Sequence, residues 1–110
     1  MIDYNEYELL EFFGAEPRII GEEEVGIYEY NLIDKYGFAF ELHFSLYDES
    51  CILTLQYDSL KVPIFDLRFD YVEKIQCDTE KLIIHRTANQ RNIVFYVKPN
   101  YALAFEECLL

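Results

Sequence analysis

The stretch Gly37-Phe-Ala-Phe-Glu-Leu-His-Phe-Ser-Leu-Tyr47 decides the fold, because apolar residues recur at every second position. Side chains of a strand point alternately to its two faces, so this period predicts a strand with one buried face. The opposite face carries Glu41 and His43. We therefore expect this strand to lie at the centre of the hydrophobic core. Its apolar face is formed by Phe38, Phe40, Leu42, Phe44 and Leu46.

Further strands are predicted on both sides of this stretch. Residues 25–34 alternate in the same way, and Asp34-Lys-Tyr-Gly37 is a turn that joins the two strands as a hairpin. Later strands are predicted at 51–57, 63–71, 72–77, 82–87 and 92–98. We expect a bulge near Tyr71, and we expect the strand that follows Pro63 to begin after it or to lie at an edge. Residues 101–110 are predicted as a strand followed by a short tail, although their alanines favour a helix.

One helix is predicted at the N-terminus, over about residues 4–13. Asp3 and Glu6 have the spacing of a capping box, and Gly14 stands where a glycine often ends a helix. Tyr7, Leu10 and Phe13 recur at three-residue steps with Leu9 beside them, and predict the apolar side.

These elements define an α+β, mostly β fold in a single domain spanning residues 1–110. We expect an antiparallel sheet or a partly open barrel of seven to eight strands with one N-terminal helix, because the connections are too short for crossover helices. The chain has 110 residues, 52% of them hydrophobic, which suffices for a core. Its three cysteines show no CxxC spacing, and no stretch resembles a signal peptide or a membrane span, so we expect a cytoplasmic protein with reduced thiols.

Negative charge is concentrated in the first half of the chain. Residues 1–50 contain thirteen Asp and Glu against two Lys and Arg, a net charge of −11, whereas residues 51–110 contain eight against seven, a net of −1. The total of −12 argues against nucleic acid or an anionic membrane as a partner, because like charges repel. The acidic half is either a solvated surface that aids solubility or a surface that binds a basic partner.

No arrangement of residues in the sequence indicates catalysis or a bound cofactor. The two histidines, His43 and His85, lie in predicted strands without a nucleophile motif, and the four glycines are not clustered. Glu41 and His43 share a strand face and, with Glu29 or Asn31 from the next strand, would supply metal ligands. Ordinary polar residues on a solvated face explain them more simply, so we predict no metal, no cofactor and no enzyme.

The second half of the chain has a characteristic hydrophobic spacing. It consists of Pro63-Ile64, Leu67, Phe69, Val72, Ile75, Leu82, Ile84, Ile93, Phe95, Val97 and Pro99. Together with the acidic and aromatic first half, this spacing resembles that of the small strand-rich immunity proteins that accompany bacterial polymorphic and contact-dependent toxins. The resemblance implies a non-catalytic protein whose acidic face docks on the basic surface of a cognate toxin, often a nuclease, and blocks it.

The expected contact lies around the first hairpin, and steering by charge would speed the encounter. Its residues are Glu22, Glu23, Glu24, Glu29, Asp34, Glu41, His43, Asp48 and Glu49. A monomer and a homodimer both remain open. The alternatives are a secretion chaperone, which an exposed apolar helix face and dimerisation would favour, and a small enzyme or ligand-binding barrel, which a cavity holding His43 or His85 beside a carboxylate would favour.

Overall fold

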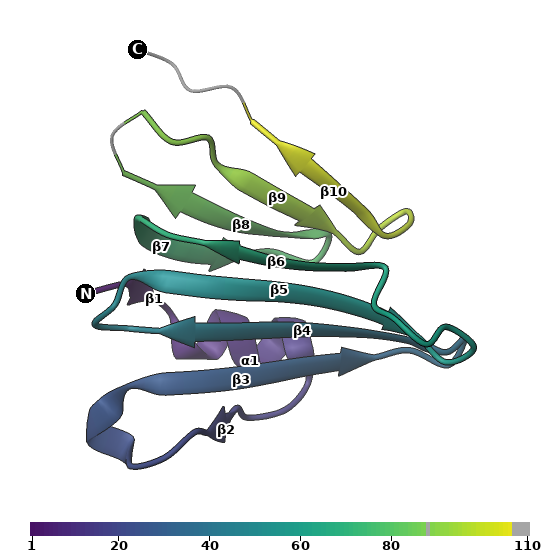
Figure 1. Cartoon of the computed structure of the whole chain (residues 1–110), viewed down its shortest axis with the longest axis horizontal. Coiled ribbons are helices and arrows are strands. Elements are labelled where there is room, and N and C mark those ends of the chain that lie inside the picture. Colours follow the sequence, from purple (N-terminus) through teal and green to yellow (C-terminus); the bar gives the residue numbers. More distant parts are fainter. Residues whose placement is uncertain (88, 107–110) are drawn as a thin grey trace.

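A computed structural model describes residues 1–87 and 89–106 of the chain. One α-helix, one short 3-10 helix and ten strands make up this part (Figure 1). In chain order they are β1 (Asp3–Tyr4), α1 (Glu6–Phe13), β2 (Arg18–Ile19), η1 (Glu23–Val25), β3 (Ile27–Ile33), β4 (Phe38–Ser45), β5 (Ser50–Tyr57), β6 (Phe65–Phe69), β7 (Val72–Cys77), β8 (Lys81–Arg86), β9 (Ile93–Tyr96) and β10 (Ala102–Phe105). The fold is mostly β with one N-terminal α-helix, as the sequence predicts.

The strands form two open sheets of five strands each. The first sheet has the order β2-β3-β4-β5-β6, and the second has the order β1-β7-β8-β9-β10. Neighbouring strands are antiparallel except that β1 runs parallel to β7. The chain passes from one sheet to the other between β6 and β7, where Tyr71 has a φ of 60°. The sheets therefore do not close into a barrel.

The alternating stretch at residues 37–47 contains β4, the central strand of the first sheet. Phe40, Leu42 and Phe44 are almost completely buried, as their alternation predicts, and Leu46 is buried just beyond the strand. The opposite side of β4 bears the half-buried Glu41 and His43. The predicted buried face is confirmed.

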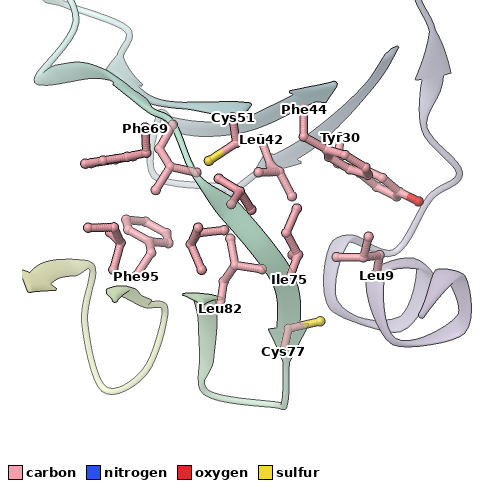
Figure 2. Packing of buried hydrophobic residues seen from close by; sticks show 14 of the residues in the cluster. Leu9, Tyr30, Leu42, Phe44, Cys51, Phe69, Ile75, Cys77, Leu82 and Phe95 are labelled. Carbon is pink, nitrogen blue, oxygen red and sulfur yellow. The ribbon is translucent and has the colours of Figure 1, made fainter. Parts of the chain in front are cut away.

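The core lies between the two sheets, and α1 closes it on one side. Phe40 of β4 stacks on Phe95 of β9 with their ring centroids 3.8 Å apart, which joins the first sheet to the second. The helix packs against β7 and β3. Figure 2 shows Leu9 pointing from α1 toward Ile75 of β7, with Tyr30 of β3 above them. The helix therefore covers the core side of the first sheet and leaves its other face open.

The helix and its cap each begin two residues later than predicted. Asn5 is the N-cap, and its Oδ1 accepts hydrogen bonds from the backbone N–H groups of Tyr7 and Glu8 at 2.9 and 3.2 Å. Asp3 instead lies in β1, so the capping box assigned to it is wrong. Asn is as effective a cap as Asp, and the parallel pairing of β1 with β7 places Asp3 in a strand. Gly14 ends the helix in the left-handed conformation, as predicted.

The strand predictions hold for β3 to β10, whereas β1 and β2 were not predicted. These two strands contain two residues each, which is too short for alternation to appear. β6 begins after Pro63 and forms an edge of the first sheet. The expected bulge near Tyr71 corresponds to a register shift between Val72 and Lys74. β10 ends at Phe105, and the predicted tail from residue 107 onward lies outside the described residues.

Candidate functional site

The structure brings five of the predicted contact residues together at one end of the first sheet. Three of them belong to the segment at η1 and two to the turn between β4 and β5, and all five are exposed. We call this surface the acidic end; it consists of Glu22, Glu23, Glu24, Asp48 and Glu49. The two segments lie on the same side in Figure 1, beyond the start of β3 and the end of β4.

A glycine holds the two segments of the acidic end together. The carbonyl oxygen of Gly26 accepts a hydrogen bond from the backbone N–H of Leu46 at 2.9 Å. Gly26 has a φ of 73°, and a Cβ at this position would lie 3.0 Å from Cε2 of the Tyr47 ring. A glycine is therefore needed both for the backbone conformation and for the close approach of Tyr47. This contact fixes η1 beside the β4–β5 turn.

The β4–β5 turn is also tied to the second sheet. The carbonyl oxygen of Glu49 accepts a hydrogen bond from the backbone N–H of Val72 at 2.8 Å, and the Oε2 atom of Glu49 lies 3.0 Å from the Met1 nitrogen. Asp70 and Tyr71 line a shallow cavity of about 350 Å³ with Asp48 and Glu49. Asp70 and Tyr71 therefore lie next to the acidic end, although the Asp70 carboxylate is paired with Arg68 at 3.2 Å. Sequence reasoning missed both residues because they belong to the connection between β6 and β7.

The outer face of the first sheet, which points away from the core, carries Glu29, Glu41 and His43. Cross-strand pairing places Glu29 beside His43, and Glu41 one row away. This face is not purely acidic. Arg18 Nε donates a hydrogen bond to Glu29 Oε2 at 2.6 Å, and only 11% of the Glu29 side chain is exposed. The Glu29 carboxylate is therefore already paired with a cation.

Glu41 lies close to another carboxylate. Burial raises the pKa of Glu41 above its ordinary value, and a hydrogen bond and charge repulsion from Glu29 raise it further, whereas Arg18 acts in the opposite direction. Two carboxyl groups that share a site favour protonation of one of them. Glu41 is consequently a weaker source of negative charge than the exposed residues of the acidic end.

Asp34 lies at the opposite end of the first sheet and stabilises a turn. Its Oδ1 accepts hydrogen bonds from the backbone N–H groups of Tyr36 and Phe38, both at 2.9 Å. Burial acts to raise its pKa, but these bonds and one from the Tyr101 hydroxyl outweigh burial and lower it. The predicted nine-residue contact is thus divided among the acidic end, the outer face and this turn.

The histidines and cysteines bear on the metal and enzyme alternatives. Within residues 1–87 and 89–106, no group of three or more His, Cys, Asp and Glu side chains gathers as a metal site. His85 Nε2 lies 3.0 Å from the amide oxygen of Gln76 rather than beside a carboxylate. Cys51 and Cys77 are buried free thiols, and burial raises the pKa of each to about 12, so both are protonated at neutral pH. Cys108 lies outside the described residues.

Over the same described ranges, no helix is long and apolar enough to cross a membrane.

The fold matches a protein from a toxin–immunity system. The chain is similar to a chain of the contact-dependent growth inhibition toxin–immunity protein complex from Klebsiella pneumoniae 342, with a TM-score of 0.75 and 20% sequence identity. The match covers 94% of this chain and 95% of that chain. No family model and no curated protein matches the sequence. The resemblance seen in the hydrophobic spacing is therefore confirmed as a resemblance of fold.

Proposed function

We propose that this protein is an immunity protein that binds a cognate toxin and neutralises it without catalysis. One observation carries the proposal: the fold matches a chain of a toxin–immunity complex over 94% of its length, with a TM-score of 0.75. The match covers almost the whole of both chains. Since a fold alone does not determine function, the surface properties of this chain must support the same role.

The acidic end supports a basic partner. Its five residues are exposed, and four of their carboxylates have no ion-pair partner among the described residues, whereas that of Glu49 pairs with the N-terminal ammonium group of Met1. The hydrogen bond between Gly26 and Leu46 holds the two segments side by side. A concentrated charge of one sign speeds the encounter with an oppositely charged protein by roughly 10-fold to 1,000-fold at low salt. An immunity protein must act before its toxin does, so a fast encounter suits this role.

Exposed aromatic residues next to the carboxylates support a stable contact. Tyr47 of the β4–β5 turn is 63% exposed, and Tyr71 beside Glu49 is 61% exposed. Tyrosines contribute strongly at protein interfaces because they combine a large apolar ring with a hydroxyl group. The toxin surface that we propose as the target is the basic region with which a nuclease binds its substrate. Masking that region would prevent substrate binding.

The decisive experiment needs a defined toxin. The candidate is the C-terminal domain of the protein encoded by the neighbouring gene, provided that this domain is basic. We expect the two purified proteins to elute together from a size-exclusion column as a stable complex, and the toxin to lose its activity in that complex. Separate elution at micromolar concentrations, with full toxin activity, would contradict the proposal.

A secretion chaperone is a second candidate, and one observation favours it. Tyr7 and Leu10 lie on an exposed side of α1, and chaperones of this kind present such a surface to an unfolded effector. A chaperone would bind the toxin only while the toxin is unfolded. Mixing this protein with folded toxin and measuring the mass by light scattering therefore separates the two candidates, since an immunity protein binds the folded toxin.

A further inference from the structure

A groove beside α1 combines exposed apolar side chains with carboxylates. It lies between the helix, the segment that leads into β2, and β3, and its volume is about 420 Å³. Tyr7 and Leu10 of the helix and Ile19 of β2 form its apolar part. Three acidic residues line it as well, namely Glu6, Glu16 and Glu23.

The apolar side chains of this groove are exposed for a clear structural reason. Leu9 and Phe13 turn toward the core. Tyr7 and Leu10, three residues apart, share a different side of the helix, so their predicted place on its buried side is wrong. β2 contains only two residues and does not extend far enough along β3 to cover that side. Tyr7 is therefore 73% exposed and Leu10 38% exposed.

The charge of the groove defines the chemistry of its occupant. Glu6, Glu16 and Glu23 are all exposed, and among the described residues no lysine, arginine or histidine lines the groove. Lysine and arginine carry long apolar stems that pack on hydrophobic side chains while their charged ends stay near water. Arginine also binds favourably over tyrosine rings. A basic residue beside an apolar residue would complement this lining.

We propose that the groove receives a segment of the toxin in which arginine or lysine stands next to an apolar residue. The basic side chain lies across Tyr7 and reaches the carboxylates, and the apolar side chain packs on Leu10 and Ile19. This inference rests on the proposed function, because the toxin is taken as the partner. Glu23 belongs both to the groove and to the acidic end, so the two form one continuous surface.

A second copy of the chain is a poorer occupant than a basic protein. The chain has a net charge of −12, and its first half holds most of the acidic residues. Dimerisation through this groove would bring carboxylates of two copies together and cost electrostatic energy. A concentration-dependent doubling of the mass, lost in the variant Tyr7→Ala, would overturn the assignment to the toxin.

Substitutions in the groove test the inference in the complex with the toxin. Tyr7→Ala and Glu16→Lys change exposed side chains and should leave the fold intact. Each should raise the dissociation constant by about tenfold or more, since one lost contact of ~1.4 kcal/mol has that effect. The matched controls Val62→Ala and Glu80→Lys lie outside the groove and are also exposed, and they should change the constant less than about twofold.

The binding measurements distinguish a wrong groove assignment from a wrong proposed function. If the complex forms and the groove variants bind like the controls, the groove assignment is wrong and the immunity role stands. If no complex forms at all, the immunity role is wrong. The groove is then judged by an assay that needs no toxin.

That assay uses two short peptides and NMR spectroscopy. Ac-Leu-Arg-Leu-Arg-NH2 should shift the backbone amide signals of α1 and β2, whereas Ac-Leu-Glu-Leu-Glu-NH2 should not. The double variant Tyr7→Ala/Glu16→Lys should abolish the shifts. Equal shifts with both peptides, or none with the basic peptide, would overturn the groove as a site for basic segments.

Discussion

Phe40 and Phe95 stack with their ring centroids 3.8 Å apart and their planes 9° from parallel, and each side chain is 1% exposed. Phe40 comes from the central strand of the first sheet and Phe95 from β9 of the second. The pair lies where the two sheets meet. It shows how the alternating stretch at residues 37–47 organises the molecule: its apolar face meets the second sheet, and its polar face remains open.

Removing the Phe40 ring should greatly destabilise the protein. Phe40→Ala is expected to lower the free energy of unfolding by about 3–5 kcal/mol, because it removes apolar contacts and leaves a cavity between the sheets. Denaturant unfolding followed by circular dichroism measures this change. Tyr7→Ala removes a ring of similar size from the surface and should change the free energy by less than about 0.5 kcal/mol. Equal losses in the two variants would contradict the described core.

The cap of α1 can be assigned by a pair of substitutions. Asn5→Ala should lower the free energy of unfolding by about 1 kcal/mol, because the N–H groups of Tyr7 and Glu8 lose their acceptor. Asp3→Ala should have a much smaller effect, since Asp3 is an exposed residue of β1. Thermal unfolding of both variants provides the measurement. A larger loss of stability in Asp3→Ala than in Asn5→Ala would mean that Asp3 is the cap.

The neighbouring carboxyl groups of Glu29 and Glu41, on the outer face of the first sheet, should make stability depend on pH. Glu41 has a pKa raised above its ordinary value of 4.5, so the folded protein binds more protons than the unfolded chain in the window just above that value. The contribution of Glu41 to stability therefore falls as the pH rises through this window. Glu41→Gln removes the repulsion with Glu29.

The variant should consequently melt at a higher temperature than the native protein at pH 7 and at nearly the same temperature at pH 4. Melting curves at the two pH values provide this comparison. A variant that melts lower than the native protein at pH 7 would mean that the Glu41 carboxylate stabilises the fold.

The acidic end should control the rate of association with the toxin. Reversing the charges of Glu22, Glu23 and Glu24 should slow association by about tenfold or more at low salt, because these exposed carboxylates attract a basic partner. Stopped-flow fluorescence measures the rate. Raising the ionic strength should slow the native protein and have little effect on the variant. An unchanged rate at low salt would remove the acidic end from the binding mechanism.

The sequence predicts the strands that are long enough to alternate, and it predicts the asymmetry of charge. Alternation directly reports a buried face, so β4 could be identified from Phe38 to Leu46. The two-residue strands carry no such pattern. The N-cap was misplaced because Asp3 and Asn5 are both good capping residues, and their choice depends on the pairing of β1 with β7, a contact between distant segments.

The arrangement of the candidate site, like the N-cap, depends on contacts between distant segments of the chain. Nothing in the sequence indicates that Gly26 and Tyr47 bring η1 beside the β4–β5 turn, or that Asp34 serves a turn at the other end of the sheet. The ion pair between Arg18 and Glu29 could not be predicted from the sequence either, because it requires β2 to pair with β3. Composition therefore located the acidic half of the chain, and the fold determines which of its carboxylates are exposed together.

Growth of bacteria that produce the toxin tests the central claim most directly. Cells that express the basic C-terminal domain encoded by the neighbouring gene should stop growing, and co-expression of this protein should restore their growth. The variant with Glu22, Glu23 and Glu24 changed to lysine should restore it less well at equal protein level. Continued growth arrest in the presence of the folded native protein would contradict the account.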